Sequence, residues 1–383
     1  MANFKEFSSE DIKDSRSYLN QLVDIINEDI VSPQTRKKYQ VFVSGGIGPG
    51  VTSSLWQTVF DQDFTLQTAN PIFDVTMGLS TGSNAVLNSN FVIDANGKYV
   101  FPSQSLMMRE KMDIYRLHAQ NLLGSTAEEF VVTSGSSDHV IKEALFLDFK
   151  RLFTRDQIKR ETFAIKLNPT ASNNVNSIAV PATPTFKIYS DIGSTQNKEF
   201  SFGGQVSTIV DANNVSHPVG LLFIDKGVAV LDMTRAFDQS PNIQGSIKAM
   251  SPSGMTPFSG SIMQLAVSAS IDDFVDHVCL TRFTGSAATA ATFQNITNIN
   301  STIYFCHVGA DEFNYSSNPT FTDEDSRIVV IDEGQEDTQR SFTFITSIGL
   351  YDAKDNLLAV AKTSRPIYND DERDLTLKVR TDF

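Results

Sequence analysis

The sequence predicts an α+β fold: an N-terminal part with three helices and a hairpin, followed by a β-rich part of short antiparallel strands, sandwich or barrel-like. Apolar residues recur at helical spacing in the first part, and short alternating runs separated by turn signals dominate the second. The sequence has no regular alternation of strand and helix patterns, so we expect no parallel sheet. We therefore expect a mixed domain over 1–168, a linker or long loop over 169–184, and an antiparallel β-rich domain over 185–383.

The first expected helix covers residues 8–30. Ser8 or Ser9 supplies an N-cap, and acidic residues follow in the first turn. Apolar residues at three- and four-residue steps then form one stripe, made of Ile12, Leu19, Leu22, Val23, Ile26 and Ile30. We expect this stripe to pack on the protein's own core or on a neighbouring chain.

Residues 41–54, VFVSGGIGPGVTSS, have the outline of a strand that leads into a phosphate-binding loop. Gly45 and Gly50 have the separation found in a P-loop. However, Val51 stands where the lysine belongs, and Pro49 removes one backbone N–H. We therefore expect no nucleotide and no other cofactor here, and a glycine-permitted turn between two packed segments.

A hairpin and two more helices complete the expected N-terminal part. Residues 91–101 alternate on either side of an Asn-Gly pair, which is typical of a two-residue hairpin turn. Residues 103–123 are amphipathic and end at a glycine, so they predict the second helix. Residues 138–160 predict the third. Its expected buried face consists of Ala144, Leu145, Phe149, Leu152 and Phe153.

The remaining elements are expected to be strands. The polar, proline-containing stretch after Lys166 indicates the linker. The expected strands and hairpins then cover 185–190, 206–224, 227–233, 262–271, 301–310, 327–332, 342–362 and 374–383. Turns are expected at 211–214 and at 352–356, the second of which would close a C-terminal hairpin with several buried apolar residues.

Composition excludes several classes of partner. The net charge of −14 argues against nucleic acid, whose binding needs clustered lysine and arginine, and against an anionic membrane. No apolar window reaches the roughly 18 residues of a membrane span, and the first residues lack the pattern of a secretory signal peptide. Two cysteines suit synthesis in a reducing cytoplasm.

No constellation of residues predicts catalysis, so we expect the protein not to be an enzyme. Its sequence lacks the zinc-protease motif H-E-x-x-H and the calcium loop of an EF-hand. His277 and Cys279 would share a face of a strand, and Cys306 and His307 are adjacent. This spacing favours buried strand residues over a metal site. Cys279 and Cys306 are expected to be free thiols, with a disulfide between them as the alternative.

Charge reverses sign locally along the chain. Residues 138–166 contain seven basic and five acidic side chains, whereas 323–383 contain eight basic and fourteen acidic ones. Either the basic helix is simply solvated, or it meets an acidic surface of a neighbouring copy. For the second case the candidate interface residues are Arg151, Arg155, Lys159 and Arg160.

Several stretches resemble virion structural proteins of T-even-like contractile-tailed phages, above all those of marine cyanobacteria. The resemblance is carried by GVTSSLWQTVFDQDFTLQTANPIFDVTMG (50–78), ALFLDFKRLFTRDQIKRETFAIKL (144–167), FNYSSNPTF (313–321), TSIGLYDAKDNLLAVAK (346–362) and the terminal LTLKVRTDF. It implies a structural subunit located in the virion after synthesis in the host cytoplasm. Such a subunit would occupy the tail or baseplate and contact other virion proteins as a homo-oligomer within a symmetric assembly.

Two alternatives remain open at this point. One is a different structural place, in the neck or at the head–tail connector. The other is a receptor- or glycan-binding tail protein, for which exposed aromatic residues on β loops would be needed. Tyr304, Tyr315 and Phe321 are the candidates.

Overall fold

The structure is a computed structural model. It describes residues 4–40, 54–83, 92–93, 95, 99–100, 103–134, 137–149, 157–170, 186–238, 243–247, 256–260, 262–283, 289–310, 312–316, 319–324, 334, 338 and 340–382. The P-loop-like segment 41–53 and most of the expected linker therefore lie outside the described residues, as do Arg151 and Arg155.

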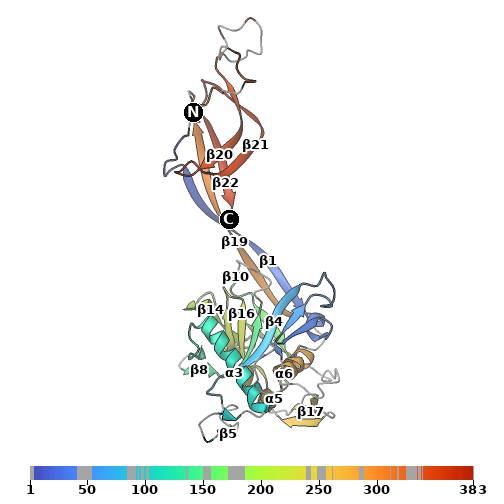
Figure 1. Cartoon of the computed structure of the whole chain (residues 1–383). Helices are drawn as coiled ribbons and strands as arrows, with labels where there is room; N and C mark the ends of the chain where they lie inside the picture. The colour runs from blue at the N-terminus through green and yellow to red at the C-terminus, as the bar shows by residue number, and fades with distance from the viewer. Residues whose placement is uncertain are drawn as a thin grey trace. The chain divides into compact units, whose positions relative to one another are not determined.

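The chain divides into two compact units (Figure 1). Unit 1 consists of Met1–Leu19 and Asn298–Phe383, and unit 2 of Asn20–Thr297. Two long strands, β1 (Ile12–Ile26) and β19 (Thr289–Val308), contribute residues to both units. The units have other bounds than the expected domains 1–168 and 185–383, because the N-terminal strand pairs with a strand from late in the chain.

The expected α+β class is wrong, because the protein is mostly β. Among the described residues, strands make up 50% and helices 16%. Fourteen strands are joined in one antiparallel sheet with the main order β1-β19-β11-β12-β14-β15-β16-β9-β4-β3-β2, in place of the expected sandwich or barrel of short strands. The expectation of antiparallel pairing holds for every described pair whose register is known.

Unit 2 contains most of this sheet and all the described helices. Its strands are β2 (Arg36–Gln40), β3 (Ser54–Phe60), β4 (Pro71–Leu79), β5 (Val92–Ile93), β6 (Tyr99–Val100), β7 (Phe130–Ser134), β8 (Ser137–Ile141), β9 (Glu143–Asp148), β10 (Gln157–Ile158), β11 (Ala164–Leu167), β12 (Lys187–Ser190), β13 (Glu199–Ser201), β14 (Gly204–Asp211), β15 (Asn214–Phe223), β16 (Val228–Asp232), β17 (Ile243–Ile247) and β18 (Thr256–Gly260). Its helices are α1 (Asn27–Val31), α3 (Ser103–Leu122), α4 (Met233–Ala236), α5 (Ile262–Ser268), α6 (Ile271–His277) and the π-helical turn η3 (Val278–Arg282).

Of the three expected N-terminal helices, only the second is confirmed, as α3. The segment 8–30 forms β1 and the short α1. The described parts of 138–160 form β8, β9 and β10. Conversely, the strand expected at 262–271 is α5 and the start of α6. The pairing of β5 with β6 confirms the expected hairpin over 91–101, while its Asn-Gly turn lies outside the described residues.

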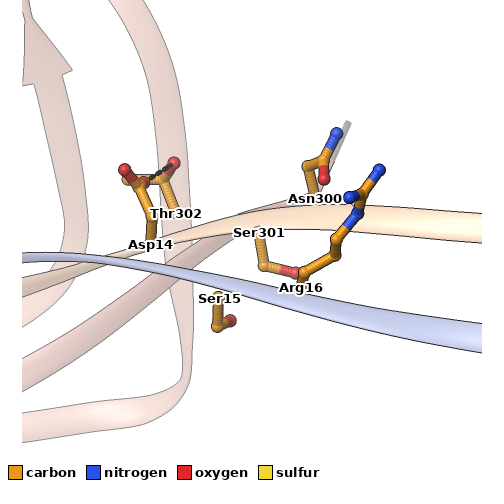
Figure 2. A pocket seen from close by; sticks show the side chains of 6 residues that line it. All are labelled: Asp14, Ser15, Arg16, Asn300, Ser301 and Thr302. Carbon is orange, nitrogen blue, oxygen red and sulfur yellow. Dashed lines mark hydrogen bonds between the residues drawn. The ribbon is translucent and has the colours of Figure 1, made fainter.

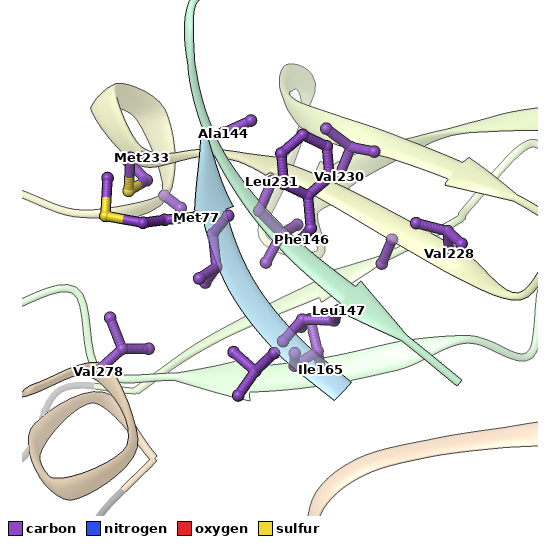
Figure 3. Packing of buried hydrophobic residues seen from close by; sticks show 14 of the residues in the cluster. Met77, Ala144, Phe146, Leu147, Ile165, Val228, Val230, Leu231, Met233 and Val278 are labelled. Carbon is purple, nitrogen blue, oxygen red and sulfur yellow. The ribbon is translucent and has the colours of Figure 1, made fainter. Parts of the chain in front are cut away.

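The core of unit 2 is centred on β9. This strand lies between β4 and β16, and Phe146 stands opposite Thr76 on one side and Val230 on the other. Its ring stacks on His118 of α3 with centroids 3.9 Å apart, so α3 covers this part of the sheet. Figure 3 shows Phe146 packed among apolar side chains of the neighbouring strands. A strand with neighbours on both edges and both faces buries every apolar side chain, which explains the unbroken run ALFL.

One buried cation ties two helices of unit 2 together. Lys111 of α3 is completely buried, and its Nζ donates hydrogen bonds to the carbonyl oxygens of Ala266 at 2.5 Å and Ala269 at 2.6 Å. These carbonyls lie at the C-terminal end of α5, where a helix has unpaired acceptors and favours positive charge. Lys111 therefore fixes α5 against α3.

Unit 1 is built from few strands. Besides its parts of β1 and β19, it contains β20 (Thr343–Tyr351), β21 (Leu357–Asn369) and β22 (Leu375–Asp382). β22 pairs with β19 from Ser301↔Asp382 to Val308↔Leu375. β20 and β21 form a separate two-stranded hairpin closed by the Asp352–Asn356 turn, which confirms the expected C-terminal hairpin.

Candidate assembly interface

Unit 1 buries very few apolar side chains. Among its described residues only Val308, Phe342, Leu350 and Val379 are buried and apolar, whereas the continuous hydrophobic core is drawn entirely from unit 2. A small domain that buries so little apolar surface gains little stability from it. A two-stranded hairpin such as β20–β21 is itself only marginally stable in water. The described residues of unit 1 therefore supply little of the apolar burial that stabilises a fold.

Large apolar side chains are instead exposed on unit 1. They are Phe4, Phe7, Ile12, Tyr18, Leu19, Phe313, Tyr315, Phe344, Tyr351, Leu357, Leu358, Val360 and Tyr368. Single exposed apolar residues are ordinary, but a concentration of them in one small unit is typical of a protein interaction surface. This distribution also corrects an expectation. Of the apolar residues around the hairpin turn, Leu350 is buried, whereas Leu357, Leu358 and Val360 are exposed.

Five rings form an aromatic cluster at the end of the hairpin away from its turn. Phe344 and Tyr368 are cross-strand partners with centroids 5.6 Å apart, and Phe342 stacks on Tyr368 at 5.6 Å. Phe321 meets Phe342 edge-to-face at 6.1 Å, and Tyr315 meets Phe321 at 6.4 Å. Phe342 is the buried member of the cluster, with 4% of its surface exposed. Tyr315, Phe344 and Tyr368 are 53%, 50% and 47% exposed.

The hairpin also offers a free strand edge. In the described part of the chain β20 pairs with β21 alone. Its sequence, TFITSIGLY, contains neither a charge nor a proline. The opposite strand carries Lys362, Arg365 and Pro366, residue types that protect an edge against pairing. β20 is therefore the edge that another strand can extend.

The N-terminal segment is held against unit 1 by a series of local contacts. Phe4 packs edge-to-face on Tyr351 at 4.9 Å, and Phe7 lies 5.6 Å from Tyr304. Lys5 pairs with Glu312 at 2.5 Å, and this hydrogen bond lowers the pKa of the Glu312 carboxyl. These contacts leave the rings half-exposed, so they do not replace a core.

A pocket of about 390 Å³ also lies in unit 1, lined by residues of β1 and β19. Figure 2 shows its lining: Asp14, Ser15, Arg16, Asn300, Ser301 and Thr302. Thr302 donates to Asp14 at 2.8 Å, and Ser301 donates to Asp382 at 2.7 Å. The hydroxyls of Ser301 and Thr302 are thus engaged in contacts between segments of unit 1.

The basic residues proposed as an interface do not form a helical face in the described chain. Lys159 follows β10 and donates to Gln294 at 3.1 Å. Arg160 is half-buried and donates to the carbonyl of Ser194 at 2.6 Å and to Gln205 at 3.1 Å. Both side chains therefore serve contacts within unit 2, while Arg151 and Arg155 lie outside the described residues.

The cysteine and histidine residues considered for a metal site belong to different units. His277 and Cys279 are buried in α6 and η3 of unit 2, not on a strand as expected. Cys306 and His307 lie on β19 in unit 1, and both cysteines are free thiols. No cluster of three potential metal-ligating side chains occurs among the described residues. Likewise, no described helix is long and apolar enough to cross a membrane.

The sequence reasoning found Tyr315 and Phe321 but missed the rest of the aromatic cluster. The alternation of Phe342, Phe344 and Tyr368 around an expected hairpin was the available signal. The third candidate, Tyr304, is covered in part by Phe7. Comparisons with protein-family models, curated proteins and solved structures give no match.

Proposed function

We propose that this chain is a structural subunit of a phage virion, a tail or baseplate component that assembles through unit 1. The observation that carries the proposal is the contrast between the units. Unit 2 has a continuous core, whereas unit 1 has four buried apolar side chains among its described residues and many exposed ones. A unit of this kind is stable when neighbouring proteins cover it, which is the situation of a virion component.

The sequence resemblance to virion proteins of contractile-tailed phages supports the same proposal. The hairpin that contributes to this resemblance, residues 346–362, belongs to the exposed part of unit 1. Its uncharged edge strand β20 suits the addition of a strand from another subunit. The partners are other virion proteins and further copies of this chain. The role requires no cofactor and no catalysis.

Antibody labelling of phage particles tests this function. Antibodies raised against the purified chain are applied to particles of the phage that encodes it, and gold labels are located by electron microscopy. We expect labels at the distal end of the tail. Labels at the neck would favour the head–tail connector instead. Particles without any label, checked by mass spectrometry for absence of the chain, would contradict a structural role.

Exposed aromatic rings favour one second candidate, a receptor- or glycan-binding tail protein. Tyr315 is half-exposed beside Phe321, in the arrangement that a sugar ring stacks on. Binding of the purified chain to a glycan array, lost on Tyr315→Ala, would favour this role. We prefer the structural role because the exposed apolar residues extend over the whole of unit 1.

A further inference from the structure

Acidic residues lie close in the sequence to rings of the aromatic cluster. Asp323 and Glu324 follow Phe321 closely, and Asp370, Asp371 and Glu372 follow the end of β21, close to Tyr368. Arg340 pairs with Glu372 at 2.6 Å and with Asp371 at 3.6 Å, so one cation is shared between two of these carboxylates. These five acidic residues, called the acidic rim below, outnumber the arginine that pairs with two of them, so the rim has a net negative charge.

Unit 1 as a whole also has a negative net charge. Its residues include 20 acidic and 11 basic side chains, a net charge of −9, against −14 for the entire chain. Two copies of unit 1 that meet at this cluster would bring like charges together, which is unfavourable. A partner of opposite charge gains from the same field.

The aromatic rings and the carboxylates both attract a cationic side chain. The face of an aromatic ring is negative and attracts a guanidinium or ammonium group. An arginine that stacks on Phe344 or Tyr368 also lies within the field of the acidic rim. A neutral sugar would use the rings and gain nothing from the charge, and an acidic segment would be repelled.

We infer that the aromatic cluster with its acidic rim docks a basic segment of another protein, in which arginine or lysine residues are interspersed with apolar ones. The apolar residues cover the half-exposed rings, and the cations pair with the rim. The inference rests on the proposed function, since it names the partner of the same assembly surface. It predicts association that weakens with salt, because exposed charges are screened.

Binding of labelled peptides to the purified full chain tests the inference without any virus particle. The probe is a short fluorescent peptide that alternates arginine and leucine. Matched peptides carry glutamine or glutamate in place of arginine, and maltohexaose is the sugar probe. We expect the arginine peptide to bind, the glutamine peptide to bind at least tenfold more weakly, and the glutamate peptide not to bind.

Variants locate the binding. The double variant Phe344→Ser/Tyr368→Ser should lower the affinity for the arginine peptide at least tenfold. The matched control is Phe200→Ser, because Phe200 is 73% exposed and belongs to unit 2, which contains none of the rim residues. This control should bind like the wild type. Circular dichroism establishes that each variant is folded.

A second variant decides the case if the double variant does not fold. Asp370→Asn/Asp371→Asn/Glu372→Gln changes two exposed side chains and the half-buried Asp370, and it should also weaken binding at least tenfold at low salt. Wild-type affinity in the folded double variant, or in this triple variant, would overturn the inference. So would equal binding of the glutamine peptide, or binding of maltohexaose alone, which would assign the rings to a glycan. None of these outcomes bears on whether the chain is found in particles.

Discussion

Leu350 and Leu358 lie on paired strands of one hairpin, yet 7% of Leu350 and 69% of Leu358 is exposed. The difference follows from the two faces of the hairpin. Leu350 shares the inner face with Ile348, whereas Leu358 points outward with Val360. Two leucines of the same sequence motif therefore have separate roles, one in the small core of unit 1 and one on its contact surface.

Aspartate substitutions separate these roles. Leu350→Asp buries an unpaired charge, so we expect it to destabilise unit 1 by several kcal/mol and to unfold the hairpin. Leu358→Asp changes an exposed site and should alter the free energy of unfolding by about 0.5 kcal/mol or less, while weakening assembly. Hydrogen exchange of residues 343–369 measures the first effect. Equal exchange in the two variants would show that the hairpin faces are assigned wrongly.

Lys111 gives unit 2 a specific pH dependence. Burial lowers the pKa of the Lys111 ammonium to about 7, against the opposing effect of Glu110 and Asp273. An unfolded lysine keeps its proton to about pH 10.4, so between these values the unfolded state binds more protons. The contribution of Lys111 to the free energy of unfolding therefore rises with pH from about 7, at no more than about 1.4 kcal/mol per pH unit.

Urea unfolding from pH 6 to pH 9 tests this dependence in the wild type and in Lys111→Met. The variant loses the donor to the carbonyls at the end of α5, which should cost about 1–3 kcal/mol near neutral pH. The stability difference between wild type and variant should widen as the pH rises above 7. Parallel profiles over this range would contradict the assignment.

At the scale of elements, the pairing of β15 with β16 leaves no room for a side chain at one position. A methyl group added at Gly220 would lie 2.2 Å from the carbonyl oxygen of Val230. β16 cannot move away, because it is paired on its other edge with β9. The glycine is thus required by the close approach of two backbones.

Gly220→Ala should accordingly destabilise unit 2 by about 3 kcal/mol, through overpacking against a fixed backbone. Gly82→Ala is the matched control, because its nearest contact is the movable carboxylate end of Glu129 at 3.3 Å. Thermal unfolding of both variants measures the difference. A similar melting temperature for the two would contradict the sheet order around β15.

The elements also explain which parts of the fold the sequence could predict. α3 was predictable because it packs one face on the sheet, so its buried Met108, Tyr115 and Leu122 recur at helical spacing. The run in β9 is continuous because both faces are buried, and such a run does not distinguish a strand from a buried helix. The predicted fold class was therefore wrong in segments such as β9, where both faces of the strand are buried.

The prediction of a helix over 8–30, where the structure has β1, was wrong for the opposite reason. Its apolar residues have helical spacing, but most of the strand is exposed, and Leu19 and Leu22 point to solvent. Pairing with β19, a partner from late in the chain, determines its conformation, and no local pattern contains that information. The prediction of a basic helix over 138–160 was wrong for the same reason. Lys159 and Arg160 contact residues of distant segments, which the sequence does not place beside them.

At the scale of the whole molecule, stability and contact surface are assigned to different units. Unit 2 contains the continuous core, while unit 1 contains most of the excess negative charge and a concentration of exposed apolar residues. Such a division suits a subunit that folds first and completes its structure on assembly. The sequence predicted the C-terminal hairpin, but its exposure required the three-dimensional structure.

Hydrogen exchange of unit 1, compared between the isolated chain and intact particles, tests this account most directly. In the isolated chain we expect β20 and β21 to exchange much faster than β9, because their amides are covered by few apolar contacts. In particles, exchange of residues 343–369 should slow at least tenfold, while β9 should stay unchanged. If β20 and β21 are as protected as β9 in the isolated chain, and their exchange is the same in particles, unit 1 is not the assembly interface.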